Sequence, residues 1–309
     1  KISMFTNVTI DDVFSCHDAK SIFMIPQMLY EQGLVDVVFK KFAKVGYTNT
    51  STNWDNWNAI VNSLQKTDDA IKIAMVGKYV TLADSYVSVN EALKHASASI
   101  GRSVNIDWID SETLNGNLDQ LHNFDGVLVP GGFGTRGSEG IIDTATYALE
   151  KNIPYLGICF GFQLAAVAFG RKMCNLENAN STEIVSDTTN PIIDLLPEQK
   201  DETDMGGSLR LGANEIMISQ DSLAHKIYSS DKIFKRHRHR YEFNTKYRDE
   251  FLKNGMIFSG ESDDGKRMEI LEVPSHKFFL GVQFHPEFNS RPGFPEDAFK
   301  TFVTAASQN

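Results

Sequence analysis

The strongest constraint on the fold is an alternation of continuous apolar segments with amphipathic segments between residues 71 and 170. Apolar runs with strand character occupy 71–77, 104–110, 124–132 and 153–159, and helical patterns occupy 84–101, 141–152 and 160–170. Parallel strands covered on both faces read as continuous apolar runs, and helices between them cover the sheet. The pattern predicts a three-layer α/β/α fold around a central, mostly parallel sheet.

The second half of the chain is less regular. Residues 208–218, 266–275 and 277–287 alternate in the manner of strands, whereas 186–206 are polar and contain proline. We expect this last segment to be a mobile surface loop.

The first 70 residues do not show this alternation of strands and helices. Residues 18–33 predict a helix capped by Asp18 and stopped by Gly33, with Pro26 either in its first turn or at a kink. Residues 45–58 are rich in Thr and Asn and predict a linker, followed by a short helix through Trp57 and Leu64. We therefore divide the chain into the end of one unit at 1–50, a linker at 51–69 and a main domain at 70–309.

Composition excludes several classes of protein. A net charge of −10 over 309 residues disfavours general attraction to DNA or to an anionic membrane. The sequence contains no apolar run of the roughly 18 residues that a membrane span needs. Cys16, Cys159 and Cys174 are odd in number and scattered, which fits a reducing cytoplasm better than a disulfide framework. Cysteine and histidine do not cluster at zinc spacing, so we expect no metal site.

Cys159 stands between Gly157 and Gly161, where an apolar strand gives way to a helix. One interpretation is a small buried core residue. The other is a nucleophile, because this spacing matches the nucleophile elbow and the helix dipole favours a thiolate. The backbone N–H of Phe160 would then be one donor to an oxyanion.

Two further segments decide between these interpretations. The PGGFG loop at 130–134 is either an ordinary turn or a source of a second oxyanion donor, since Gly131 and Gly132 leave room for a ligand. His285 and Glu287 follow an apolar strand, and at i and i+2 of an extended segment they face the same way. A cysteine nucleophile needs such an imidazole and an acid that orients it, so the combination favours the nucleophile.

With these motifs the chain resembles the class I, triad-type glutamine amidotransferases and, within them, the CTP synthase family. GICFGFQ and QFHPE carry the general resemblance. The specific resemblance extends along essentially the whole chain, in the segments KISMF, VGKYVTLADSYVSVNEALKHA, VPGGFGTRG, ANSTE, MGGSLRLG and RHRHRYEFN. It implies a flavodoxin-like sheet.

The resemblance also implies residue roles. Cys159 attacks the side-chain amide of L-glutamine, His285 is the general base and acid, and Glu287 orients His285. Gly132 and Phe160 form the oxyanion hole. Glutamine would be bound by Gly132, Phe160, Gly161, Phe162, Gln163, Glu183 and Arg240. A carboxylate such as Glu183 suits the α-ammonium group, and a guanidinium such as Arg240 suits the α-carboxylate.

The basic run at 235–240 needs its own interpretation. Such runs often bind phosphates or nucleic acid, or are simply solvated. This one is short, lies in an acidic chain and is flanked by aromatic residues. We favour a wall of the site that carries Arg240.

The rest of the family's reaction involves groups beyond this chain. In the family a synthase domain aminates UTP to CTP with ATP and Mg²⁺, GTP activates the glutaminase, and the enzyme forms homotetramers and filaments. VGKY at 76–79 lacks the spacing of a phosphate-binding loop, so we expect only the glutaminase portion here, with no cofactor of its own and weak hydrolysis at best when alone. Lys1, His17, Asp18 and Ala19 match family positions that touch nucleotides.

Two alternatives remain open. A γ-glutamyl hydrolase-like cysteine hydrolase could share the scaffold, although it would have no need of the KISMF segment. A catalytically silent regulatory or assembly module is the other, although it would have no need of Cys159, His285 and Glu287.

Overall fold

The computed structural model describes residues 1–42, 53–66, 68–80, 82–114, 116–195 and 209–309. A nine-stranded sheet forms its centre, in the order β2-β1-β3-β4-β12-β11-β10-β7-β8. The first five strands of this order run parallel: β2 (Val104–Asp110), β1 (Ile71–Gly77), β3 (Gly126–Val129), β4 (Tyr155–Ile158) and β12 (Phe279–Val282). The predicted α/β/α architecture with its central parallel strands is confirmed.

The sheet continues beyond β12 in an antiparallel half, which the sequence indicated only in part. It consists of β11 (Met268–Glu272), β10 (Ile257–Ser262), β7 (Arg210–Ile218) and β8 (Lys232–His239). A second, three-stranded sheet holds β5 (Ala179–Ser181), β6 (Asn190–Leu195) and β9 (Tyr241–Phe243). The expectation of a mobile loop over 186–206 is therefore wrong at 190–195, where Ile192 and Ile193 are buried, and 196–206 lie outside the described residues.

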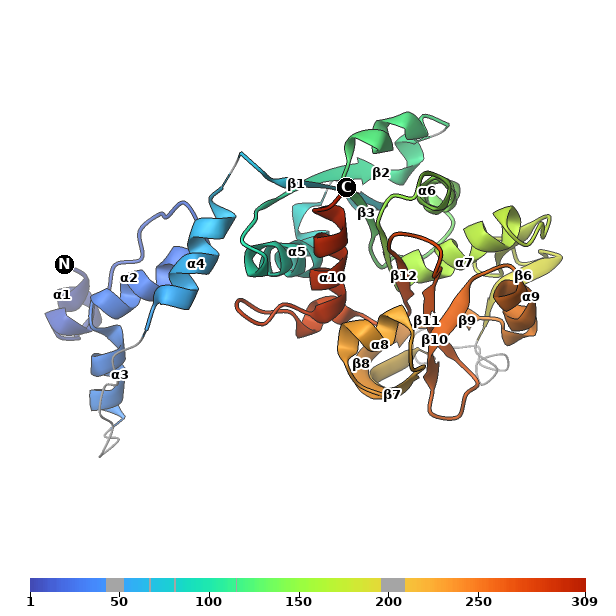
Figure 1. Cartoon of the computed structure of the whole chain (residues 1–309). Helices are drawn as coiled ribbons and strands as arrows, with labels where there is room; N and C mark the ends of the chain where they lie inside the picture. Colours follow the sequence, from blue (N-terminus) through green and yellow to red (C-terminus); the bar gives the residue numbers. More distant parts are fainter. Residues whose placement is uncertain (43–52, 67, 81, 115, 196–208) are drawn as a thin grey trace.

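Helices cover both faces of the large sheet (Figure 1). One face carries α5 (Val87–Ser99), α8 (Leu223–Tyr228) and α10 (Asp297–Ala306). The other carries α6 (Ser138–Lys151), α7 (Phe160–Lys172) and α9 (Arg248–Lys253). Successive side chains of a strand point to opposite faces, and β1 accordingly sends Ile73 and Met75 into one core and Ala74 and Val76 into the other.

Short 3-10 turns connect several of these elements: η1 (Ile10–Asp12), η2 (Ile22–Met24), η3 (Ala83–Tyr86), η4 (Ser111–Thr113), η5 (Leu118–Asn123), η7 (Thr245–Tyr247) and η8 (Pro286–Asn289).

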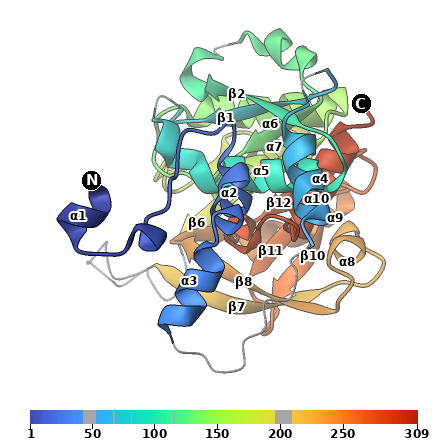
Figure 2. The same ribbon diagram turned by 90° about the vertical axis from the view of Figure 1, so that its left-hand side faces the viewer.

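The N-terminal segment is a group of short helices beside the sheet domain: α1 (Ile2–Thr6), α2 (Ile25–Glu31), α3 (Leu34–Lys41) and α4 (Asp55–Leu64). Figure 2 views the molecule with this group in front. The segment is anchored by Phe23, whose carbonyl accepts a 2.6 Å hydrogen bond from Trp57 Nε1 and whose ring packs edge-on against His95 of α5. The helix expected through Trp57 is thus confirmed, while 45–52 of the expected linker lie outside the described residues.

The helix predicted over 18–33 begins later than expected. Ser21, not Asp18, caps its first turn, where its hydroxyl accepts from the N–H of Phe23. Pro26 lies in the first turn of α2, where its missing N–H costs nothing. Gly33 adopts φ +82° and separates α2 from α3, as the glycine stop predicted. Along the described residues, we find no helix that combines the length and the apolar character needed to cross a membrane.

Gly140 generates a prediction about packing. A Cβ at this position would lie 1.9 Å from the carbonyl oxygen of Ser111, in the turn on which α6 rests. Helix propensity alone would make Gly140→Ala stabilising by about 1 kcal/mol. We expect the substitution instead to destabilise the fold by about 1–3 kcal/mol, because the backbone at Ser111 or in α6 must move to make room for the added methyl group. The free energy of unfolding in urea would be measured for wild type, Gly140→Ala and the control Asp143→Ala, at an exposed position of α6. A Gly140→Ala variant more stable than wild type would contradict the prediction.

Candidate active site

Cys159 occupies a strained position at the junction of β4 and α7. Its backbone has φ +52° and ψ −96°, a region that non-glycine residues rarely adopt. The flanking glycines permit the sharp turn. A Cβ on Gly157 would lie 2.7 Å from the backbone of Gly161, and one on Gly161 would lie 2.3 Å from the carbonyl oxygen of Val129. Such strain is typical of functional positions rather than of filler residues.

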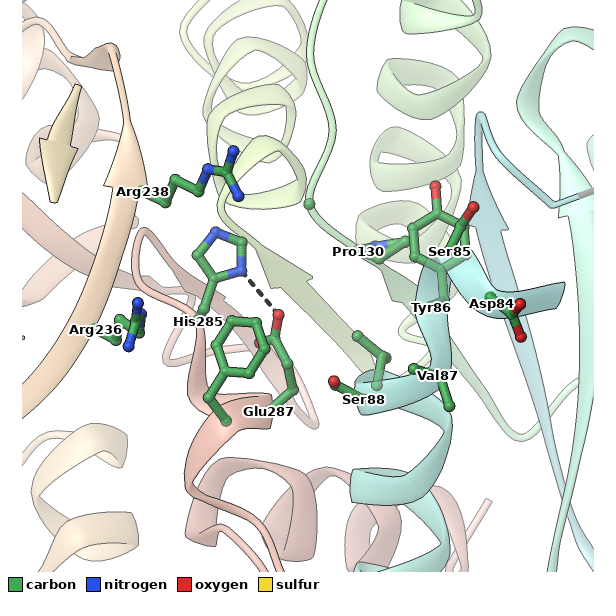
Figure 3. A pocket seen from close by; sticks show the side chains of 13 residues that line it. Asp84, Ser85, Tyr86, Val87, Ser88, Pro130, Arg236, Arg238, His285 and Glu287 are labelled. Atoms are coloured by element: carbon green, nitrogen blue, oxygen red, sulfur yellow. Dashed lines mark hydrogen bonds and ion pairs between the residues drawn. The ribbon is translucent and has the colours of Figure 1, made fainter. Parts of the chain in front are cut away.

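His285 reaches the Cys159 side chain from the neighbouring strand. β12 pairs with β4 at Val282 and Ile158, so the chain segments that follow the two strands lie together. The imidazole interacts with the Cys159 side chain, which contributes to its raised pKa, and through Nδ1 it hydrogen-bonds with Glu287 Oε1 at 2.8 Å. Figure 3 shows this second bond. The three side chains that the sequence singled out are therefore brought together.

Glu287 reaches His285 by a different route from the one expected. Pro286 does not keep the segment extended, because it begins the 3-10 turn η8. The turn places the carboxylate beneath the imidazole, and Glu287 is itself buried. The expected contact is present, but the extended geometry behind it was wrong.

The electrostatics of this cluster favour a charged imidazole. Burial disfavours the imidazolium, but hydrogen bonds to Cys159 and Glu287, together with their charges, outweigh it and raise the pKa of His285 to about 10. His285 is then an imidazolium beside the sulfur at neutral pH. A cation in this position favours a thiolate nucleophile.

Gln283 is a contact of the sulfur that the sequence did not reveal, although it lies inside the QFHPE motif. Its Nε2 donates to Cys159 Sγ at 3.7 Å, and its Oε1 accepts from Gln163 Nε2 at 3.3 Å. A glutamine that ends an apolar strand reads as solvent-facing, yet this one is fully buried. Only strand pairing could have placed it behind the cysteine.

The two predicted halves of the oxyanion hole lie against each other. A Cβ on Gly131 would be 3.0 Å from the His285 ring and 3.8 Å from Cys159 Cβ, and one on Gly132 would be 3.5 Å from the Phe160 ring. The glycine-rich loop therefore lies within van der Waals distance of Cys159 and Phe160, and a side chain at Gly131 would crowd the His285 ring. This close approach favours the oxyanion interpretation over that of an ordinary turn.

Glu183 and Arg240 provide opposite charges at the same place. Glu183 accepts a 2.8 Å hydrogen bond from the N–H of Gly134. Burial raises the pKa of Glu183, while the charges of Lys78 and Arg240 oppose the rise. The Nε of Arg240 is buried without a hydrogen-bond partner. A paired anionic and cationic site suits the α-ammonium and α-carboxylate of an amino acid.

Gly161, Phe162 and Gln163 serve the packing of α7. Phe162 is fully buried in the hydrophobic core, so its side chain does not reach the site. The Gln163 amide donates to the carbonyl oxygen of Tyr241 at 2.7 Å as well as to Gln283. Contacts of these three residues with a ligand would have to come from backbone groups or from a rearranged Gln163.

Residues 235–239 of the basic run lie in β8, where they are divided between two faces, and Arg240 directly follows the strand. Lys235, His237 and His239 point inward and are buried. Arg236 and Arg238 are exposed and, with His285 and Glu287, line a cavity of about 590 Å³ (Figure 3). The run thus contributes Arg236 and Arg238 to a wall of this cavity, whereas Arg240, which was expected in such a wall, is not among the residues that line it.

The inward histidines are electrically neutral. Burial lowers the pKa of His237 to about 2 and that of His239 to about 3. His237 Nδ1 lies 3.2 Å from His239 Nε2 and 3.6 Å from Glu269 Oε2, so these three offer ligand atoms near enough to hold a metal ion. Arg210 already pairs with Glu269 and balances its charge.

The predicted nucleotide-contacting residues lie elsewhere. Lys1, His17 and Asp18 are exposed and Ala19 is half-buried, all in the N-terminal segment. The structure does not bring them to the Cys159 site.

Comparison with known proteins defines the class. The family model for class-I glutamine amidotransferases matches residues 81–305, and the chain belongs to this family. More particularly, it belongs with the CTP synthase glutaminase domains. The solved Trypanosoma brucei CTPS glutaminase domain with bound acivicin is similar to it with a TM-score of 0.73 and 36% identity, over 78% of this chain and 95% of that one.

Bacterial relatives agree with this placement. The chain is 47% identical to CTP synthase of Staphylococcus haemolyticus over 99% of its length, and 46% identical to that of Staphylococcus carnosus over 100%. It spans 57% of the length of each of these relatives.

We expect His285→Gln to slow alkylation of Cys159 by iodoacetamide at pH 6 by about tenfold or more, because a thiolate reacts and a thiol does not. The imidazolium is present below about pH 10 and is lost as the pH rises through that value, so the two rates should converge in strong base. Peptide mass spectrometry would separate Cys159 from the exposed Cys16. His122→Gln, at an exposed histidine, is the control. Equal alkylation rates at pH 6 in wild type, His285→Gln and His122→Gln would contradict an ion pair between His285 and Cys159.

Proposed function

We propose that this chain hydrolyses L-glutamine to glutamate and ammonia with Cys159, His285 and Glu287. The observation that carries the proposal is the convergence of a strained cysteine, an imidazole and a buried carboxylate after the carboxyl ends of two adjacent parallel strands. Membership of the amidotransferase family supports it independently.

The reaction proceeds in two steps on this geometry. The Cys159 thiolate attacks the carboxamide carbon, and the N–H groups of Gly132 and Phe160 stabilise the oxyanion. His285 donates its proton to the departing nitrogen, so ammonia leaves and a thioester remains on Cys159. Neutral His285 then takes a proton from water, the resulting hydroxide attacks the thioester, and glutamate leaves as the thiolate re-forms. Glu287 keeps Nδ1 of His285 oriented throughout.

Glu183 and Arg240 select the amino-acid end of the substrate. The Glu183 carboxylate receives the α-ammonium group and the Arg240 guanidinium receives the α-carboxylate, which fixes the distance from this end to the sulfur. Gly161, Phe162 and Gln163 contribute backbone groups to the pocket.

The full enzyme supplies the use for the ammonia. A synthase domain of the kind carried by the longer relatives would aminate UTP to CTP with ATP and Mg²⁺, with GTP as activator and a homotetramer as the working assembly. Residues 1–50 would be its last part, 51–69 the linker and 70–309 the glutaminase. Lys1, His17, Asp18 and Ala19 would contact nucleotides there. A cytoplasmic location completes the proposal. GTP-independent glutaminase turnover in the full-length enzyme would count against this coupling.

The alternatives explain less. A γ-glutamyl hydrolase-like enzyme leaves the similarity of residues 1–80 to CTP synthases unexplained, since the amidotransferase model begins only at residue 81. A silent assembly module leaves the strained Cys159 unexplained.

Cys159→Ala should reduce ammonia release from glutamine by at least about 10³-fold, since the covalent route is lost. The matched control is Cys174→Ala, which removes a buried thiol away from the site. A coupled assay of the glutamate formed together with ammonia, with the synthase domain present, would give the turnover of both variants. Turnover that survives in Cys159→Ala would refute the nucleophile.

Arg240→Lys should raise KM for glutamine by about tenfold or more and change kcat less, because an ammonium cannot replace a planar, bidentate guanidinium. Arg291→Lys, at an exposed site, is the control. A fall in kcat with an unchanged KM would assign Arg240 to the transition state instead.

A further inference from the structure

Lys78 is a buried lysine that the proposed mechanism does not use. It belongs to the VGKY segment, which has a Gly-Lys pair without the spacing of a phosphate loop, and it directly follows β1. Its side chain is in contact with protein on all sides, since only 4% of the residue is exposed. Lysine is almost never buried to this degree without specific partners.

Its partners belong to the two segments that carry the predicted oxyanion donors, the glycine-rich loop and the start of α7. Nζ donates to the carbonyl oxygens of Phe133, at 2.9 Å, and Gly134. The same ammonium lies 4.2 Å from the centroid of the Phe160 ring, close enough for a cation–π interaction. One charged group thus contacts both the glycine-rich loop and the residue after the nucleophile.

The glycine-rich loop is held from its other side as well. Glu183 accepts from the N–H of Gly134, next to the carbonyls that Lys78 binds. Arg136, at the end of the loop, donates through Nη2 to the carbonyl oxygen of Lys78 at 2.6 Å. Lys78 and Glu183 therefore fix the peptide groups on either side of Gly134, two residues from Gly132.

Burying this ammonium is unfavourable, which indicates that the hydrogen bonds matter. Burial lowers the pKa of Lys78 to about 8, an effect that the charge of Glu183 opposes and that of Arg136 adds to. An apolar side chain would fill the same space without that cost. Glycines at 131, 132 and 134 give the loop much backbone freedom, so something else has to fix it.

We propose that Lys78 is a positioning residue for the oxyanion hole, which holds the 131–134 loop against Phe160 so that the N–H groups of Gly132 and Phe160 face one oxygen atom. This inference rests on the proposed function. Lys78 acts through the loop and touches neither the substrate nor the sulfur.

The test uses two probes of Cys159 that differ in their need for an oxyanion hole. An aldehyde analogue of glutamine, with CHO in place of the carboxamide, accepts the thiolate at carbon; its oxygen takes up the C=O electron pair and lies in the hole. Iodoacetamide reacts by displacement of iodide and develops no such oxyanion. The affinity of the first and the rate of the second are measured on the same 309-residue chain.

We expect Lys78→Met to weaken binding of the aldehyde by about ten- to a hundredfold, somewhat less than the 10²–10³ typical of deleting a donor outright. Its iodoacetamide rate should stay within about twofold of wild type, because direct displacement does not use the hole. Lys72→Met, at an exposed lysine of β1, the strand that Lys78 follows, is the matched control and should change neither value. Hydrogen exchange in the 130–137 peptide should rise in Lys78→Met while that of β3 and β4 does not.

The outcomes separate the two proposals. If wild type does not bind the aldehyde, the proposed function fails. If wild type binds it and Lys78→Met binds equally well, only the role of Lys78 fails. If hydrogen exchange rises in every peptide of Lys78→Met, that variant is destabilised as a whole. The aldehyde affinity is then measured on Lys78→Gln, whose amide can replace one of the two hydrogen bonds that Lys78 donates. Aldehyde affinity between those of wild type and Cys159→Ala would then support the proposal, and wild-type affinity would overturn it.

Discussion

The site depends on one backbone conformation, the left-handed φ of Cys159 at the end of β4. That conformation ends the strand, starts α7 and places Cys159 at the carboxyl ends of the parallel strands. It persists because the surroundings leave no other choice. Gly157 and Gly161 approach each other too closely for side chains, and the N–H of Cys159 donates to the carbonyl oxygen of Val282 at 2.7 Å. The same hydrogen bond joins β4 to β12, so the strain at the nucleophile and the arrival of His285 have one structural cause.

The parallel half of the sheet could be predicted because its signals are local. Most of its strands are continuous apolar runs, an α-helix follows each of β1, β3 and β4, and the glycines of the two loops stand at strand ends. The antiparallel half carries weaker signals. In β8 both the buried and the exposed positions from 235 to 239 hold Lys, Arg or His. A run of basic residues of this kind predicts a solvated surface, so the alternation is not visible in the sequence. Likewise β6 contains Asn190, Pro191 and Asp194, and its pairing with β9 was not visible in the sequence.

The candidate site shows the same division. Cys159, His285 and Glu287 carry their chemistry in their side chains and stand at strand ends, so motif and spacing sufficed to find them. Gln283 and Lys78 do not. Gln283 becomes a contact of the sulfur only when β12 pairs with β4, and Lys78 becomes a contact of the glycine-rich loop only when that loop returns over β1. Residues whose function comes from tertiary contacts leave no pattern along the chain. The turn at Pro286 belongs to this group, because a proline is compatible both with an extended segment and with the first position of a 3-10 turn.

Burial assigns different charges to three histidines that lie near one another. His237 and His239 lie within the reach of the charges of Arg210 and His285, both of which add to the effect of burial in lowering their pKa. His285 is also buried, but it alone interacts with both Cys159 and Glu287, whose hydrogen bonds and charges move its pKa in the opposite direction. A second imidazolium in this space would repel the first and weaken its hold on the sulfur. Because His237 and His239 stay neutral, the proton that the proposed reaction needs is kept at His285. The alternation of side chains along β8 buries these two histidines and, for the same reason, directs Arg236 and Arg238 outward.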